Sequence, residues 1–184
     1  YASIAGLPVP FAPVHLLFIN LLTDSLPAIA LGVEPHTSDV MNEKPRSADE
    51  SILTKDFLGK IGLEGFVIGA MTMIAFLTGY HQDGALLGST YAFGTLCLAR
   101  LFHGFNCRSR HSIFKIGLAS NIYSVGAFFG GVLLLALVIF VPVMRTLFSV
   151  SPLSGYQIGM IALLAFIPTV IIQIYKAIKE HVHA

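Results

Sequence analysis

The sequence predicts an all-α membrane protein, a polytopic bundle of five spanning helices. Two observations lead to this fold class. Of the 184 residues, 55% are hydrophobic and only 11% are charged, and the mean hydropathy is +0.78. A soluble domain carries about 25% charged residues. The second observation is that five separate stretches approach the roughly 20 predominantly apolar residues that a spanning helix needs.

The expected spans cover residues 11–33, 57–80, 87–106, 121–143 and 156–175. A long, polar and charged segment, 34–56, follows the first span, and we expect it to form a cytoplasmic loop. We assign residues 1–184 to one transmembrane domain. The chain begins YASIAG, without a Met, a basic segment or a cleavage site. This beginning favours a piece of a longer protein over a chain with a signal peptide.

The distribution of basic residues predicts the orientation. If the chain alternates across the bilayer, nine Lys and Arg residues fall on one side and only Arg145 on the other, with Arg100 inside a span. Because Lys and Arg accumulate in cytoplasmic loops, we expect the N-terminus outside and the C-terminus in the cytoplasm. The net charge of +1 does not suggest a nucleic acid as partner; the expected partner is the lipid bilayer. The nine residues are Lys44, Arg46, Lys55, Lys60, Arg108, Arg110, Lys115, Lys176 and Lys179.

The first span carries three polar residues in an otherwise apolar run. Asn20, Thr23 and Asp24 are spaced i, i+3 and i+4, which places them on one face of an α-helix. Asp24 lies near the middle of the expected span. A carboxylate at that depth is costly unless it is paired, protonated or bound to a cation, so we expect it to face the interior of the bundle.

Pro27 follows this polar face. Proline has no N–H, so the helical hydrogen bond to the carbonyl of Thr23 cannot form. Hard cations prefer carboxylate, carbonyl and amide oxygens, and transporters build ion sites where helices are broken at mid-membrane depth. The pattern therefore favours a metal-ion site formed by Asn20, Thr23 and Asp24. The alternative is a proline kink whose polar side chains bond to neighbouring helices.

The stretch FINLLTDSLPAIALGVEPHTSDVMNEKPR, residues 18–46, closely resembles the sixth membrane helix and the following cytoplasmic loop of P-type ATPases. The family pattern is roughly V-N-L-x-T-D-x-x-P-A, then A-L-G, an acidic stretch and M-x-x-x-P-R. The match is best to type 2 pumps, which include the Ca²⁺ pumps, in their bacterial form. The rest of the chain resembles the last four membrane helices in length, spacing and loop polarity. The five spans would then be helices six to ten.

The resemblance implies that Asn20, Thr23 and Asp24 fall on cation-ligand positions and that Ca²⁺ is the transported ion, across what would be a bacterial plasma membrane. ATP and Mg²⁺ would act only in the parent protein. The chain contains no DKTGT motif, nucleotide-binding domain, TGE-bearing actuator or fourth and fifth helices. We therefore expect no catalytic or cofactor-binding residue in it and no activity of the piece alone. Its partners would be the missing helices and cytoplasmic domains of the same pump.

Other functions stay open from the residues alone. The parent could transport another cation, such as Na⁺, K⁺, H⁺ or Mn²⁺. A passive helical bundle, either a channel or a scaffold, is an alternative from a different class. The carboxylates of the missing fourth and fifth helices would distinguish between the possible transported cations. An upstream DKTGT motif would exclude a passive bundle.

Arg100, in the third span, departs from the family pattern. It falls where the two-site calcium pumps of muscle type have a Glu ligand in the eighth helix. A guanidinium has only donors and stays protonated, so it cannot coordinate a cation. One hypothesis is that Arg100 fills one cation site and pairs with Asp24, which would leave one Ca²⁺ per cycle. The alternative is that Arg100 extends its side chain to the cytoplasmic edge.

Glu64 and His103 are two further candidates within the spans. Glu64 follows Lys60 by four residues, so we favour an interfacial ion pair over a functional acid. His103 lies one turn beyond Arg100 and needs no special role, although a part in counter-transport is an alternative. Cys97 and Cys107 are interpreted as reduced, structural residues.

Overall fold

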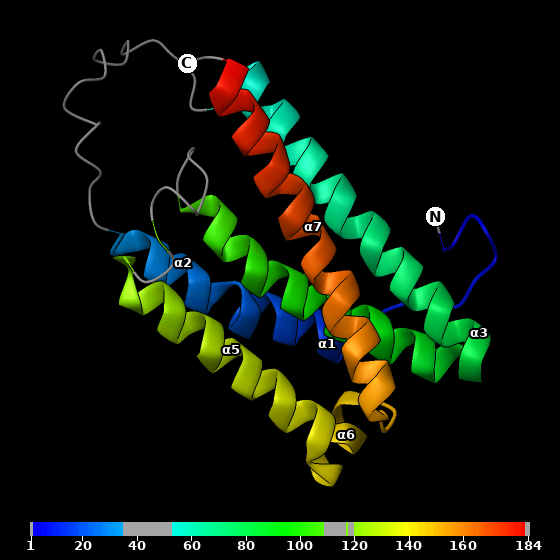
Figure 1. Ribbon diagram of the computed structural model, residues 1–184. Helices are drawn as coiled ribbons and strands as arrows, with labels where there is room; N and C mark the ends of the chain where they lie inside the picture. Colours follow the sequence, from blue (N-terminus) through cyan, green and yellow to red (C-terminus); the bar gives the residue numbers. More distant parts are fainter. Residues whose placement is uncertain (1, 35–52, 109–116, 118–119, 183–184) are drawn as a thin grey trace.

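The computed structural model is all-helical over the residues that it describes, which are 2–34, 53–108, 117 and 120–182 (Figure 1). The predicted all-α fold is thereby confirmed. A π-helical turn, Ile19–Thr23, joins the first two helices. In chain order the helices are α1 (Pro13–Phe18), α2 (Ser25–Gly32), α3 (Lys55–Cys107), α5 (Ile122–Phe140), α6 (Pro142–Phe148) and α7 (Gly155–Val182).

Four helical segments of the described chain are long and apolar enough to cross a membrane: Pro13–Gly32, Phe57–Cys107, Ile122–Phe140 and Gly155–Ile178. The second has 51 residues, more than twice the length that one crossing needs. Its backbone is not helical at Asp83 and Gly84. A Cβ on Gly79 would lie 2.8 Å from the carbonyl oxygen of Leu87, whereas eight residues of straight helix span about 12 Å. α3 therefore folds back on itself and makes two passes.

Two helix ends differ from the expected spans. α5 ends at Phe140 because Val141 is extended and Pro142 follows; a residue before proline avoids the helical region. Pro142 then starts α6, a short helix that the sequence pattern does not predict. α7 continues to Val182, beyond the expected end at 175. Residues 35–52 of the expected loop, Arg110 and Lys115 lie outside the described residues.

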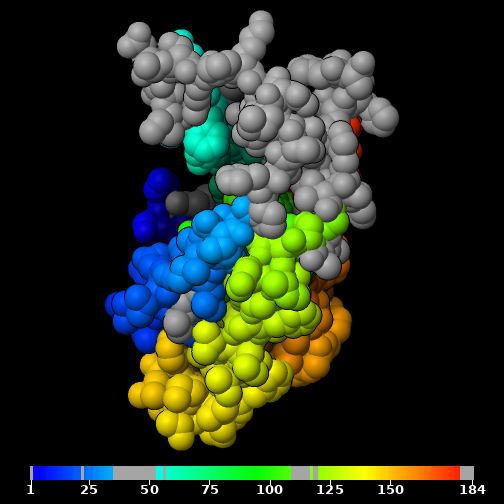
Figure 2. Space-filling model, turned by 90° about the vertical axis from the view of Figure 1, so that its left-hand side faces the viewer, coloured from blue at the N-terminus to red at the C-terminus, as the bar shows by residue number. Residues whose placement is uncertain are grey.

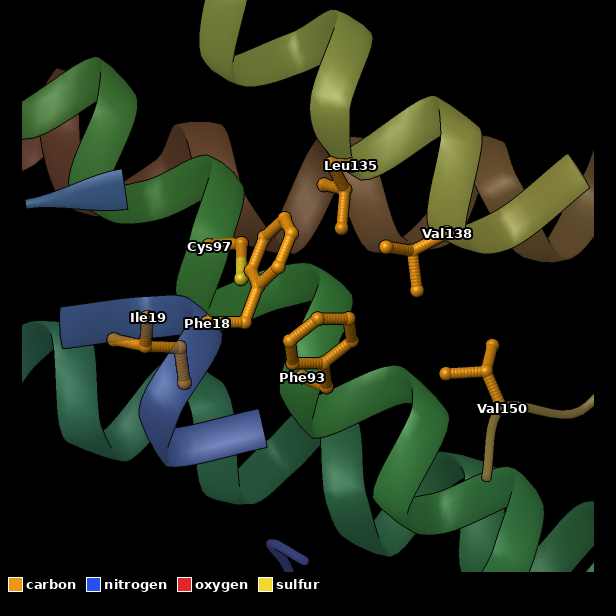
Figure 3. Close-up of a cluster of buried hydrophobic side chains, with 7 residues drawn as sticks. All are labelled: Phe18, Ile19, Phe93, Cys97, Leu135, Val138 and Val150. Carbon is orange, nitrogen blue, oxygen red and sulfur yellow. The ribbon is translucent and has the colours of Figure 1, made fainter. Parts of the chain in front are cut away.

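The helices form one bundle. α7 runs along α3, and α5 lies against α2 and the second pass of α3. Figure 2 shows α2 and α5 side by side on one face, with α6 at one end of the molecule. Figure 3 shows the central hydrophobic cluster, which brings together the first span, the second pass of α3, α5 and the segment before α7. Its buried members are Phe18, Ile19, Phe93, Cys97, Leu135, Val138 and Val150.

Gly131 allows α5 to approach the second pass of α3 closely. A Cβ at this position would collide with Cδ2 of Leu101. Gly126, on the same helix, has no neighbouring atom within 4 Å of an added Cβ. The two glycines therefore form a matched pair for a packing test.

We expect Gly131→Ala to lower the free energy of unfolding by about 1–3 kcal/mol, the usual cost of overpacking a core. Gly126→Ala adds the same methyl group in open space and should leave stability nearly unchanged. Thermal unfolding of the full-length protein in detergent measures both variants. Equal melting temperatures for the two variants would contradict the close packing at Leu101.

Candidate cation site

The first span is irregular immediately before Pro27. The amide of Asp24 donates to the carbonyl of Ile19, five residues earlier, at 3.1 Å. The hydroxyl of Thr23 donates to the same carbonyl at 2.7 Å. α2 begins at Ser25, so Pro27 lies in its first turn, where the missing N–H is tolerated. π-helical turns inside α-helices often lie at functional sites.

The structure places the three predicted ligands differently. The side chain of Thr23 is buried at 1% exposure, that of Asp24 is partly exposed, and that of Asn20 is exposed. Asn20 lies beside Leu17 and Leu21, each 62% exposed. Residues spaced i, i+3 and i+4 share a face in an α-helix, whereas the π turn at Ile19–Thr23 changes the angular spacing. The assignment of the three residues as ligands stays a prediction.

Asp24 forms an ion pair across the bundle. Its Oδ2 lies 2.8 Å from Nη2 of Arg100, on the second pass of α3. Both side chains are partly exposed, at 33% and 39%. One turn beyond Arg100, a Cβ on Gly104 would lie 3.1 Å from Cβ of Pro27. The absence of a side chain at Gly104 thus lets the second pass of α3 come close to the start of α2, where Asp24 meets Arg100.

No group of three or more His, Cys, Asp and Glu side chains that could hold a metal ion occurs among the described residues. The candidate site, which we call the ion face, thus combines the carboxylate of Asp24, the side-chain oxygens of Asn20 and Thr23, and the guanidinium of Arg100. These side chains can contribute to a cation site if other parts of the protein supply further oxygen ligands. The fixed positive charge of Arg100 would repel a second cation bound next to Asp24.

Glu64 lies between two positively charged or protonatable groups. Lys60 Nζ is 3.8 Å from its carboxylate, and His103 Nε2 is 3.6 Å from it on the other side. The predicted Lys60–Glu64 pair is confirmed. The contact with His103 was not foreseen, because it joins the two passes of α3.

A buried polar group lies next to this pair, between α7 and the end of α3. Gln173 donates to the side-chain oxygen of Asn106 at 2.6 Å, and Lys176 donates to the carbonyl of Asn106. Lys176 is only 5% exposed. From the sequence, Lys176 was expected only as one of the nine basic residues on the cytoplasmic side. The spacing of Thr169, Gln173 and Lys176 places them on one face of a helix, and all three are buried. This spacing was the one sequence feature that could have indicated a polar contact on α7.

A second network joins three helix ends at one end of the bundle. Glu34, just after α2, accepts from Nε of Arg108 at 3.0 Å and from Nη2 at 2.7 Å. Asn121 donates to Glu34 and to the carbonyl of Ala30, while its own side-chain oxygen caps α5. Burial alone would raise the pKa of Glu34, but the hydrogen bonds from Arg108 and Asn121 and the guanidinium charge lower it below 4.5.

We expect Glu34→Gln to lower the free energy of unfolding by about 1–3 kcal/mol near neutral pH, because the Arg108 side chain, 2% exposed, loses its carboxylate. The pKa of Glu34 is lower in the folded state, so its stabilising effect is complete above the ordinary value of 4.5 and is lost as pH falls through the folded value. Melting temperatures of both proteins across pH 3–7 should therefore converge at the acid end, and a difference independent of pH would contradict this account.

A multi-pass helical bundle with a carboxylate at a π turn inside a spanning helix is an arrangement suited to the membrane part of an ion transporter. The chain belongs to the family described as "Cation transporting ATPase, C-terminus", whose model matches residues 8–178. The resemblance to P-type ATPases drawn from the first span is thereby confirmed.

The chain is also similar to curated proteins that are named calcium-transporting ATPases. The chain is 38% identical, over 98% of its length, to "Calcium-transporting ATPase 1" of Bacillus cereus, of which it covers 22%. It is 36% identical over 92% of its length to "Calcium-transporting ATPase" of Bacillus subtilis, covering 19% of that protein. It is also 36% identical over 93% of its length to "Calcium-transporting ATPase lmo0841" of Listeria monocytogenes, again covering 19%. The chain thus spans about a fifth of the length of these relatives.

Proposed function

We propose that this chain forms the last five membrane passes of an ATP-driven Ca²⁺ pump and that Asn20, Thr23 and Asp24 contribute oxygen ligands for the transported ion. The names of the relatives support Ca²⁺ as the cargo. The placement of Asp24 directly after a π turn supports an ion site at this depth. ATP hydrolysis, with Mg²⁺, would take place in domains outside this chain, so the chain alone would be inactive.

The observation that carries the proposal furthest is the 2.8 Å ion pair between Asp24 and Arg100. A guanidinium this close to Asp24 neutralises the negative charge of its carboxylate. That charge is then no longer available to balance a second divalent cation. Arg100 has no acceptor to offer a cation. We therefore propose that Arg100 occupies one of two possible cation positions and that the pump moves one Ca²⁺ per cycle.

The geometry favours this role over the alternative, in which Arg100 reaches for the membrane edge. Arg108 marks that edge, two turns further along α3, and its guanidinium is engaged with Glu34. The guanidinium of Arg100 instead contacts a residue in the middle of the first span. An arginine that only extended toward water would leave the carboxylate of Asp24 without this partner.

The face of the first span that bears Asn20 provides the place for the missing ligands. Leu16, Leu17 and Leu21 are each at least 48% exposed beside Asn20, and no described part of the chain covers them. We propose that the missing N-terminal membrane helices of the same pump pack there and complete the coordination of Ca²⁺. The assembled pump would lie in a bacterial plasma membrane, with the N-terminal end of this chain outside and its C-terminal end in the cytoplasm.

The experiment that tests the proposal is the ATPase activity of the full-length protein, screened over Ca²⁺, Mn²⁺, Na⁺ and K⁺. The proposal predicts stimulation by Ca²⁺ at the lowest concentration. Stimulation by Na⁺ or K⁺ without a response to Ca²⁺ would overturn the ion assignment. Ion flux without any ATP hydrolysis would favour a passive channel.

A further inference from the structure

The short helix α6 lies at the level of a membrane boundary. It follows α5, whose 19 residues span about 28 Å at the helical rise, close to the thickness of the hydrocarbon core. Figure 2 shows α6 at one end of the molecule. It therefore lies among the lipid headgroups when α5 crosses the bilayer, at the opposite end of the bundle from Glu34 and Arg108.

α6 has one apolar side that faces outward. Val143 is 65% exposed and Leu147 is 61% exposed, and their spacing of four residues places them on the same face. Arg145 lies between them in sequence and projects from the other side of the helix, where it is half-buried. An apolar face combined with a basic residue is typical of helices that lie in the membrane interface.

Arg145 has a buried donor that is unsatisfied within the described part of the chain. Its Nε is buried and has no hydrogen-bond partner among the described residues. Arg145 is also the only Lys or Arg between residues 116 and 175 of the sequence. An unsatisfied buried donor is costly, and a guanidinium pairs best with a carboxylate or a phosphate, which can accept two of its bonds.

A groove opens beside Arg145. It has a volume of about 480 Å³ and is lined by Leu86, Pro142, Arg145, Thr146, Ser149, Val150 and Pro152. The lining has two hydroxyl groups, one cation and no carboxylate. After α6 the chain turns through Ser149, in the left-handed region at φ 50. The amide of Val150 donates to the carbonyl of Arg145 at 2.9 Å, which holds this loop around the groove.

We propose that this groove binds the phosphate of an anionic phospholipid, with Arg145 as its charged contact and the acyl chains passing along Leu86, the exposed apolar residue of the lining. The depth of α6 places lipid phosphates at the same level as the guanidinium. A zwitterionic headgroup brings an ammonium group that no carboxylate of the lining can meet, so an anionic headgroup fits better. The bound lipid would hold the α5–α6–α7 turn at the membrane boundary.

The test uses the full-length protein in nanodiscs that contain a photoreactive phosphatidylglycerol, with labelled peptides mapped by mass spectrometry. We expect labelling of residues 142–152, and Arg145→Gln should reduce it about fivefold, the effect of one basic residue near an anionic surface. Arg145→Lys keeps the charge and should retain most of the label. Lys55→Gln, which removes an exposed charge at the opposite end of the bundle, is the matched control and should leave this labelling unchanged.

Two further arms identify the source of the phosphate. A photoreactive phosphatidylcholine should label the same peptide several-fold less, and excess inorganic phosphate should not displace the phosphatidylglycerol probe. Displacement by inorganic phosphate would assign the groove to free phosphate and overturn the lipid proposal. Equal labelling in Arg145→Gln, equal labelling by the two lipids, or no label at 142–152 in the wild type would overturn it as well.

Discussion

Replacement of Asp24 by Asn in the full-length protein is expected to reduce Ca²⁺-stimulated ATP hydrolysis by about a hundredfold or more. Asp24 is the carboxylate of the proposed ion face, and even residues that only support the ligands of a metal are worth about 10–100-fold in affinity or activity. The measurement is the Ca²⁺ dependence of ATP hydrolysis. Asp83→Asn makes the same chemical change at the turn inside α3 and should leave the Ca²⁺ response unchanged.

The Asp24→Asn variant also leaves Arg100 without its carboxylate, so a second variant separates the two effects. If activity falls only because the guanidinium is unpaired, Asp24→Asn combined with Arg100→Met should restore it. If Asp24 is a ligand, the double variant should stay inactive. A single Asp24→Asn variant with Ca²⁺ affinity within about twofold of the wild type would contradict the ligand role.

The second large effect is expected at Arg100. Arg100→Glu exchanges a donor-only group for a carboxylate beside Asp24, and two carboxylates form a stronger site for a hard cation. We expect the number of Ca²⁺ ions transported per ATP to rise from one toward two and the Ca²⁺ activation curve to become steeper. Uptake of radioactive Ca²⁺ into proteoliposomes, divided by phosphate release, measures the ratio.

Two control variants at the same position define what Arg100 contributes. Arg100→Lys retains a positive charge near Asp24 and should keep one Ca²⁺ per ATP. Arg100→Met removes the charge without adding a ligand and should also keep one. If Arg100 only extended toward the membrane edge, Arg100→Glu would leave the transport ratio at its wild-type value.

The helical fold could be predicted because the spans are determined by local composition. Long apolar stretches separated by polar residues predict crossing helices, and the gap between the expected spans 57–80 and 87–106 contains Asp83 and Gly84, where the structure places the reversal. α6 could not be predicted in the same way. Its seven residues, PVMRTLF, are too few for a periodic pattern, and only Pro142 indicates a helix start.

The site was predictable in part. The spacing of Asn20, Thr23 and Asp24 indicated a polar face near Pro27, but no residue pattern indicates a π turn, which differs from an α-helix by one extra residue. The networks depend on contacts between distant positions, such as Glu34 with Arg108, 74 residues apart. A single sequence carries no direct signal for such pairs. Asn121 begins the expected span 121–143, but its contact with Glu34, 87 residues away, has no counterpart in the sequence pattern.

The most direct test of the account is the number of Ca²⁺ ions that the wild-type, full-length pump transports for each ATP hydrolysed. Purified protein in sealed proteoliposomes allows Ca²⁺ uptake and phosphate release to be measured on the same sample. The ion pair between Arg100 and Asp24 predicts a ratio of one. A ratio of two would show that Arg100 does not occupy a cation position and would contradict the central claim.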